Sequence, residues 1–130
     1  GIQAAVGRQF DKSCSQLDMA STAVSLLGRP FVQAGWGRNI FALDPQDPGY
    51  AILKPSGSDK TVAMVYGEEV IVKGPGIPAE LYRIDLGFPP SDQLLNAEAT
   101  DNPVYRQLGA FLETAVICLA ERKTGHDIAT

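Results

Sequence analysis

The chain has 130 residues, of which 45% are apolar and 20% charged, which is typical of one ordinary globular domain. The formal net charge is −4, and the 11 lysines and arginines are spread thinly along the sequence. Because phosphate binding requires a basic stripe, this distribution argues against nucleic acid as a partner. No apolar run approaches the ~18 residues that a membrane span needs, so we expect no direct membrane insertion.

The cysteines and the start of the chain give two further expectations. Cys14 and Cys118 have no CxxC spacing and no neighbouring histidine. We interpret them as free or buried thiols, with a disulfide between them as the alternative. The sequence begins at Gly1, without a methionine or a signal-peptide pattern. We therefore expect residues 1–130 to form a single domain that is a fragment of a longer chain.

A first helix is predicted over about residues 16–27. Ser15-Gln16-Leu17-Asp18 has the form of a capping box, in which the serine oxygen accepts a hydrogen bond from the amide three residues on. The carboxylate at that position also favours the helix N-terminus. Gly28 is a natural stop, because glycine adopts the left-handed conformation that ends many helices. One face of this helix is apolar and carries Leu17, Ala20, Val24 and Leu27.

Four short strands are predicted to follow a loop over residues 29–49. Gly67 and Glu68 suit a two-residue hairpin turn with glycine first. The connections are too short for the crossover that parallel strands need, so we expect an antiparallel meander. Residues 87–100 are interpreted as loop or short turn. The predicted strands lie at about 50–54, 61–66, 69–73 and 81–86.

A second, longer helix is predicted over about residues 103–123. Asn102 is placed to cap it and Pro103 to occupy its first position, where a missing amide proton costs nothing. With the strands, this predicts an α+β fold, in which a small antiparallel sheet of about four strands lies between an N-terminal helix and a long C-terminal helix. The apolar stripe of the second helix consists of Val104, Leu108, Phe111, Leu112, Ala115, Cys118 and Leu119.

We expect no catalytic residue, no metal ligand and no cofactor in this chain. His126 is the single histidine and lies close to the C-terminus, where a catalytic base is poorly held against a nucleophile. A zinc site needs three or four converging ligands. One histidine and two distant cysteines do not supply them.

The segment Gly35-Trp36-Gly37-Arg38-Asn39 carries the candidate binding residues. An exposed Trp36 beside Arg38 would be suited to contact a ligand. The preferred interpretation is structural, because glycines on either side of a tryptophan let the backbone turn around a buried ring. Trp36 and Arg38 are therefore candidate binding residues, and this role requires their side chains to be exposed.

Four segments occur in an order typical of one enzyme family. The first runs from Ser15 to Thr22, and the second is Gly37-Arg38-Asn39-Ile40-Phe41. The third runs from Glu80 to Leu86, and a looser fourth from Pro90 to Asn96. The set resembles the late part of the sulfatase and phosphoglycerol-transferase branch of the alkaline phosphatase superfamily. The corresponding family motifs read S-x-h-D-h-x-P-T, G-R-x-h-F, E-L-Y-D-L and D-P-x-E-x-x-N-L.

The resemblance covers about residues 13–125 and departs from the family pattern in places. Ser21 stands where the family has proline, and Arg83 stands where it has aspartate. The run from Ser15 to Asp18 favours the transferase-like members, which include lipoteichoic-acid-synthase-like proteins. In this family the nucleophile, a threonine or a modified cysteine, and a metal-binding Asp-His pair lie upstream of these motifs. The resemblance therefore implies a non-catalytic C-terminal subdomain of a metal-dependent enzyme that acts on phosphate or sulfate esters.

The resemblance also implies partners and a location. The parent enzyme would hold a divalent metal, and the upstream catalytic domain of the same chain would be the partner of this subdomain. Transferase-like members are anchored in the bacterial inner membrane with this part outside the cytoplasm. The chain alone would be inert, would leave the apolar face of helix 16–27 uncovered, and would self-associate through exposed apolar surface. The alternative is a free-standing binding module that uses the Trp36–Arg38 loop.

Overall fold

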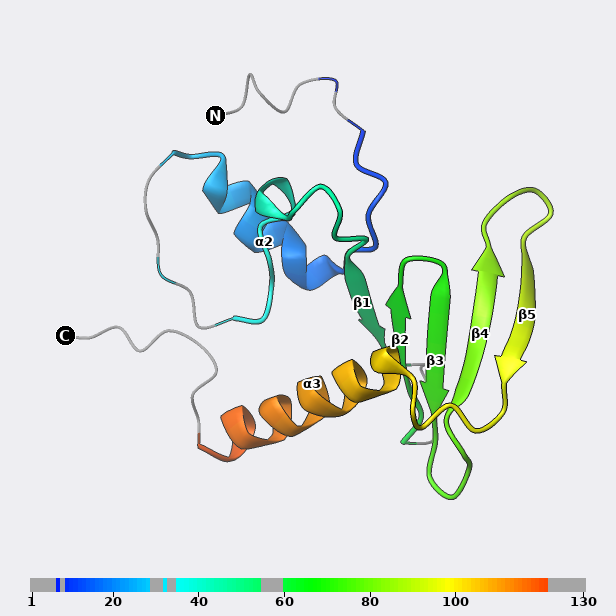
Figure 1. The fold of residues 1–130 in the computed structure, drawn as a ribbon. Helices are drawn as coiled ribbons and strands as arrows, with labels where there is room; N and C mark the ends of the chain where they lie inside the picture. Colours follow the sequence, from blue (N-terminus) through cyan, green and yellow to red (C-terminus); the bar gives the residue numbers. More distant parts are fainter. Residues whose placement is uncertain (1–6, 8, 29–31, 33–34, 55–59, 122–130) are drawn as a thin grey trace.

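One five-stranded antiparallel sheet and two helices make up the α+β fold (Figure 1). The computed structural model describes residues 7, 9–28, 32, 35–54 and 60–121. The strands lie in the order β1-β2-β3-β4-β5, which is the meander that the short connections predict. In chain order the elements are helix α2 (Gln16–Ser25), a 3-10 turn η1 (Ile40–Ala42), β1 (Tyr50–Leu53), β2 (Val62–Tyr66), β3 (Glu69–Lys73), β4 (Glu80–Asp85), β5 (Ser91–Asn96) and helix α3 (Pro103–Ala120).

The strand count corrects the prediction of four strands. Residues 87–100 were expected to be loop or short turn, yet Ser91–Asn96 pairs with β4 as the fifth strand. All six of its residues are exposed. A sequence of the form Ser-Asp-Gln-Leu-Leu-Asn has no alternation of apolar and polar residues, which is the usual strand signal. The strand exists because its backbone pairs with the edge of β4, and not because it buries a face.

The helix boundaries differ slightly from the expected ones. Helix α2 ends at Ser25, because the amides of Leu26 and Leu27 bond to carbonyls three residues back, as in a tightening 3-10 turn. Gly28 follows with a φ of 67°. Helix α3 is described as far as its C-cap Glu121. Its predicted end at Arg122 and Lys123, and the histidine His126, lie outside the described residues.

The core lies between the sheet and the N-terminal half of α3. Strand pairing places Met64, Ile71 and Leu81 in one row across the middle of the sheet. Val104 and Leu108 of α3 pack against this row, and Ile71 and Leu108 have no exposed surface. The helix is held in register at its start because the Asn102 side chain accepts a hydrogen bond from the Val104 amide at 2.7 Å.

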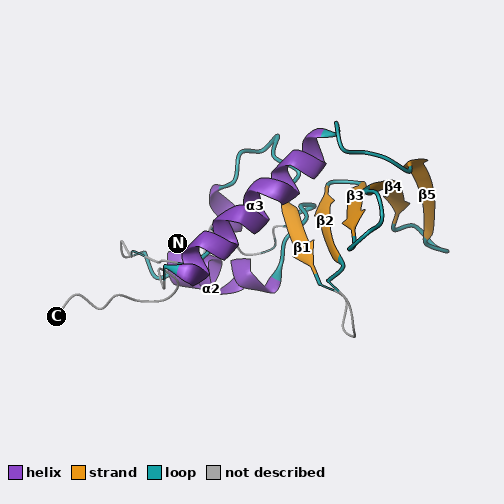
Figure 2. Cartoon of the chain, turned by 90° about the horizontal axis from the view of Figure 1, so that it is seen from below, coloured by secondary structure: helices purple, strands orange, loops and turns teal. Residues whose placement is uncertain are grey.

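The C-terminal half of α3 extends beyond the sheet. Figure 2 shows the helix passing β1 toward the side of the molecule where α2 lies. Residues 35–39 of the loop after α2, cyan in Figure 1, lie between α2 and α3 in this view. This arrangement brings the loop that carries Trp36 and Arg38 against both β1 and the far half of α3.

Replacing Leu108 with alanine tests the core. We expect Leu108→Ala to lower the free energy of unfolding by about 2–5 kcal/mol, since it removes buried methyl groups and leaves a cavity. Urea unfolding followed by circular dichroism measures this. Val116→Ala on the same helix is the control, because Val116 is 65% exposed and should change stability by less than about 0.5 kcal/mol. Equal effects of the two changes would contradict the described core.

Candidate functional site

Helix α2 is oriented with its polar residues toward the protein. The buried residues of the helix are Asp18, Ser21 and Thr22. In contrast, Leu17 is 55% exposed and Leu27, just beyond the helix, is 69% exposed. A surface helix usually buries its apolar stripe and exposes its polar face. Here the arrangement is reversed, so specific polar contacts must hold α2 in place.

The central contact is an ion pair between Asp18 and Arg38. Arg38 Nη2 lies 2.8 Å from Asp18 Oδ2, and Arg38 Nε lies 3.2 Å from Oδ1. The Arg38 backbone amide also donates to Oδ1 at 2.7 Å, and the Ser15 amide donates to Oδ2 at 2.9 Å. The Asp18 carboxylate therefore accepts four hydrogen bonds, including the reciprocal bond that the capping-box pattern predicts.

These contacts shift the pKa of Asp18. Burial opposes ionisation of the carboxyl, but the hydrogen bonds from the Arg38 side chain and from the Ser15 and Arg38 amides outweigh it. The net result is a pKa below 3.8 for Asp18. Burial likewise opposes the charge of Arg38, yet the hydrogen bond to Asp18 and its charge raise the pKa of Arg38. Each group stabilises the charged form of the other.

Two further residues let the loop approach α2 closely. A Cβ on Gly37 would lie 1.9 Å from the Leu17 carbonyl oxygen and 2.7 Å from Ser21 Oγ, so no side chain fits at this position. Thr22 Oγ1 accepts a hydrogen bond from the Ile40 amide at 3.1 Å and donates to the Arg38 carbonyl at 3.3 Å. Glycine and threonine thus complete the junction that Asp18 and Arg38 form.

Arg38 also joins this junction to the edge of the sheet. Its Nη2 donates to the Tyr50 carbonyl at 2.6 Å, and its guanidinium carbon lies 3.7 Å from the centroid of the Tyr50 ring. This stacking is an attractive cation–π contact. It partly compensates for Arg38 Nη1, a buried nitrogen that has no hydrogen-bond partner in the described part of the chain.

Trp36 lies on a different side of the same loop, against α3. Its ring meets the Phe111 ring at 73° with centroids 5.6 Å apart, and Phe111 meets Tyr50 at 70° with centroids 6.4 Å apart. Trp36 is half-buried. The structural interpretation of the glycine-flanked tryptophan therefore holds in part, because the ring packs against α3 and retains an exposed portion.

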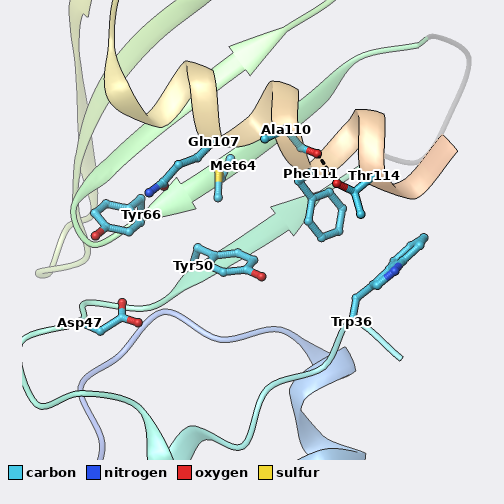
Figure 3. Close-up of a pocket in the computed structure, with 9 residues that line it drawn as sticks. All are labelled: Trp36, Asp47, Tyr50, Met64, Tyr66, Gln107, Ala110, Phe111 and Thr114. Atoms are coloured by element: carbon cyan, nitrogen blue, oxygen red, sulfur yellow. Dashed lines mark hydrogen bonds between the residues drawn. The ribbon is translucent and has the colours of Figure 1, made fainter. Parts of the chain in front are cut away.

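These rings border an elongated cavity between α3 and β1 (Figure 3). Its volume is about 560 Å³, within the range of small-molecule sites. Asp47 and Tyr66 lie toward one end and Trp36 and Thr114 toward the other, with Tyr50 between them. The lining residues come from the 36–47 loop, β1, β2 and α3, and they are Trp36, Asp47, Tyr50, Met64, Tyr66, Gln107, Ala110, Phe111 and Thr114.

The two candidate binding residues therefore have separate surroundings. Trp36 lines the cavity, whereas Arg38 is held by Asp18 and does not line it. Sequence reasoning missed the other aromatic members. Tyr50 and Tyr66 lie opposite each other on paired strands, and the predicted meander places these two strands next to each other. Phe111 was assigned to the apolar stripe of the second helix, and nothing in that stripe indicated that its far end leaves the sheet.

The part of the chain that the structure describes has neither a cluster of metal ligands nor a membrane-spanning helix. No group of three or more His, Cys, Asp or Glu residues in these ranges is placed to hold a metal ion. Cys14 is exposed, Cys118 is half-buried, and both are free thiols. Neither described helix is sufficiently long and apolar to cross a membrane.

Comparison with other proteins adds no assignment. No family model, curated protein or solved structure matches this chain.

Replacing Asp18 with asparagine tests the junction. We expect Asp18→Asn to lower the free energy of unfolding by about 3 kcal/mol at pH 7, because it leaves the partly buried Arg38 guanidinium without a counter-charge. The folded carboxyl has a lower pKa than the unfolded one, whose value is about 3.9. The stability advantage of the natural protein is therefore complete above about pH 4 and is lost as the pH falls through the folded pKa.

Denaturant unfolding of both proteins between neutral and acidic pH measures this difference. Asp92→Asn is the matched control, because Asp92 is exposed on the edge strand β5 and its change should shift stability by less than about 0.5 kcal/mol. A difference between the natural protein and Asp18→Asn that stays constant down to about pH 2 would contradict the ionised pair.

Proposed function

We propose that this chain is a non-catalytic subdomain that packs against the catalytic domain of a larger enzyme. The enzyme would be a metal-dependent sulfatase-like or phosphoglycerol-transferase-like protein that acts on phosphate or sulfate esters. The observation that carries the proposal is the orientation of α2. Its polar residues bind the rest of the chain and its apolar residues are exposed to solvent.

Exposed apolar residues on α2 form a coherent surface. Leu17 and Val24 share one face of α2, Leu27 follows just beyond the helix, and all three are exposed. Scattered apolar residues are normal on protein surfaces, but a contiguous set typically marks a contact with another protein surface. Rotating α2 to bury this face would break the contacts of Asp18 and Thr22. The contacts of Asp18 and Thr22 therefore hold α2 in an orientation that leaves its apolar face exposed.

The resemblance to the sulfatase and phosphoglycerol-transferase branch is a second, separate support for this proposal. Asp18 belongs to the first family-like segment, and Gly37 and Arg38 belong to the second. In the structure these segments meet in one junction, with Asp18 bonded to Arg38 and Gly37 against the α2 backbone. The third segment coincides with strand β4. Asp18, Gly37 and Arg38 together attach the loop to α2. This shared role is a physical reason for the first two segments to occur together in one sequence.

The proposal extends to the partner, metal and location. The upstream catalytic domain of the same polypeptide would cover α2 and supply the nucleophile and the divalent metal. The parent chain would be held at the extracytoplasmic face of the bacterial inner membrane. In this arrangement the subdomain braces the catalytic domain and borders its cleft. On its own the chain would be inert and would self-associate through the uncovered apolar face.

A second candidate function is favoured by the aromatic cavity. A free-standing binding module that uses the Trp36–Arg38 loop was the alternative from sequence. In the structure Trp36 lines the cavity between α3 and β1, while Arg38 holds the loop in place. In this form the alternative is a ligand-binding module whose contact residue is Trp36, and whose positioning residue is Arg38.

Placing charges on α2 tests the first proposal. We expect the natural chain to self-associate with rising concentration in analytical ultracentrifugation, and the double change Leu17→Glu with Leu27→Glu to make it monomeric. Both side chains are more than half exposed, so each change should alter the free energy of unfolding by only about 0.5 kcal/mol.

The matched control places the same charges elsewhere. Leu86 and Phe88 lie between β4 and β5 and are 84% and 103% exposed. The double change Leu86→Glu with Phe88→Glu adds equal charge away from α2 and should leave self-association intact. A natural chain that stays monomeric at every concentration, or an equal effect of the two double changes, would count against α2 as the contact surface.

A further inference from the structure

We propose that the cavity between α3 and β1 binds a quaternary ammonium group, such as the trimethylammonium group of choline. This inference rests on the second candidate function, in which the cavity is a ligand site. It names the chemical class of ligand that the residues lining the cavity favour, and it is independent of the docking role of α2.

The aromatic rings around the cavity are arranged as adjoining walls. Trp36 and Phe111 stand at 73° to each other, and Tyr50 and Phe111 stand at 70°. Tyr66 lines the cavity from β2, directly across from Tyr50 in the strand register. In each of these edge-to-face pairs the edge of one ring covers one face of its partner and leaves the opposite face uncovered by that contact. A cation is attracted to such faces by the ring quadrupole, and methylated ammonium groups are bound in this way.

Charge around the cavity favours a cation. Asp47 is the one charged residue among those that line it. Its Oδ1 accepts a hydrogen bond from the Gly49 amide at 2.8 Å, and its carboxylate forms no ion pair within the described residues. The ammonium of Lys12 donates to the Asp47 backbone carbonyl instead of the carboxylate. A cationic guest would therefore give the Asp47 carboxylate a direct ion pair, whereas Arg38 interacts with its charge without a direct contact.

The positive charge of Arg38 is already paired. Arg38 stacks on Tyr50 at 3.7 Å but does not line the cavity, so it approaches this ring from outside. Its charge is paired with Asp18 at 2.8 Å. The contact also demonstrates that the Tyr50 ring accepts a cation in this protein. A second cation beside Asp47 would meet the Tyr66 ring, which lies toward the same end of the cavity, and the neighbouring Tyr50 ring.

A methylated ammonium suits the lining better than a primary amine. A primary ammonium carries three donors that need acceptors, whereas most of the lining is apolar or aromatic surface from Trp36, Met64, Ala110 and Phe111. A trimethylammonium group has no donors and presents methyl groups to Met64 and Phe111. A neutral guest of the same shape would desolvate Asp47 without pairing it, which carries a free-energy cost.

Trp36 is the single tryptophan of the chain and reports on the cavity directly. The experiment titrates the protein with choline chloride at constant ionic strength and follows Trp36 fluorescence. The comparison ligand is the neutral alcohol in which a tert-butyl group replaces the trimethylammonium group, because it matches choline in shape and lacks its charge. We expect a saturable change with choline and affinity at least about tenfold weaker for the neutral alcohol.

Two substitutions locate the binding. Asp47→Asn keeps the oxygen that accepts from the Gly49 amide and removes the charge, and we expect it to weaken choline binding by about tenfold. Tyr66→Leu removes one aromatic wall and should have a similar effect. The matched controls are Asp92→Asn and Tyr82→Leu, whose positions on β5 and β4 lie outside the cavity lining. Both should bind choline as the natural protein does.

The outcomes distinguish failure of the ammonium inference from failure of the second candidate function, in which the cavity is a ligand site. Equal affinity for choline and for the neutral alcohol would overturn the ammonium inference and leave the cavity as an apolar ligand site. No response to either compound would overturn both the inference and the second candidate function. Equal weakening by Asp47→Asn and Asp92→Asn would show that the overall charge of the protein attracts choline, and this too would overturn the inference.

Discussion

The ion pair between Asp18 and Arg38 fixes how α2 and the loop after it are arranged against the sheet. It joins α2 to the loop after it, and Arg38 extends the connection to Tyr50 at the edge of the sheet. Gly37 allows this contact, because a side chain there would collide with the α2 backbone. A helix held by one nearly buried carboxylate is held in one orientation. The apolar face of α2 is exposed for that reason.

The same junction also forms the cavity. Arg38 positions the loop, and two residues earlier Trp36 meets Phe111 on the half of α3 that extends past the sheet. The space between loop, strand and helix is lined by aromatic side chains with one carboxylate, Asp47. The exposed apolar face of α2 and the cavity are thus two consequences of one contact. A change at Asp18 should affect both, whereas the exposed leucines of α2 can be altered alone.

Local sequence signals were sufficient to predict both described helices and four of the five strands. Asn102 and Pro103 mark the start of α3, and Gly67 opens the hairpin with a φ of 60°. These predictions succeeded because capping and turn geometry depend on a few adjacent residues. Strand β5 was missed because it is an exposed edge strand whose sequence carries no alternation. Its formation depends on a neighbouring strand and not on its own residues.

The candidate site was harder to predict because it depends on contacts between distant segments. The capping-box pattern predicted one hydrogen bond of Asp18, but its ion pair with Arg38 spans 20 positions and no local rule indicates it. Trp36 and Arg38 were both candidates for binding, and only the structure separates the ring that lines the cavity from the cation that holds the loop. The cavity itself forms where α3 extends past β1 and meets the loop that carries Trp36.

Amide hydrogen exchange of α2 tests the central claim most directly. It would be measured in this chain alone and in the complete polypeptide that its gene encodes. The account predicts that the amides of residues 17–27 exchange at least about tenfold more slowly in the complete polypeptide, because docking of Leu17 and Leu27 opposes local opening of the helix. The amides of β2 and β3 should change little. Equal exchange rates of α2 in the two proteins would contradict the proposal that this face packs against another domain.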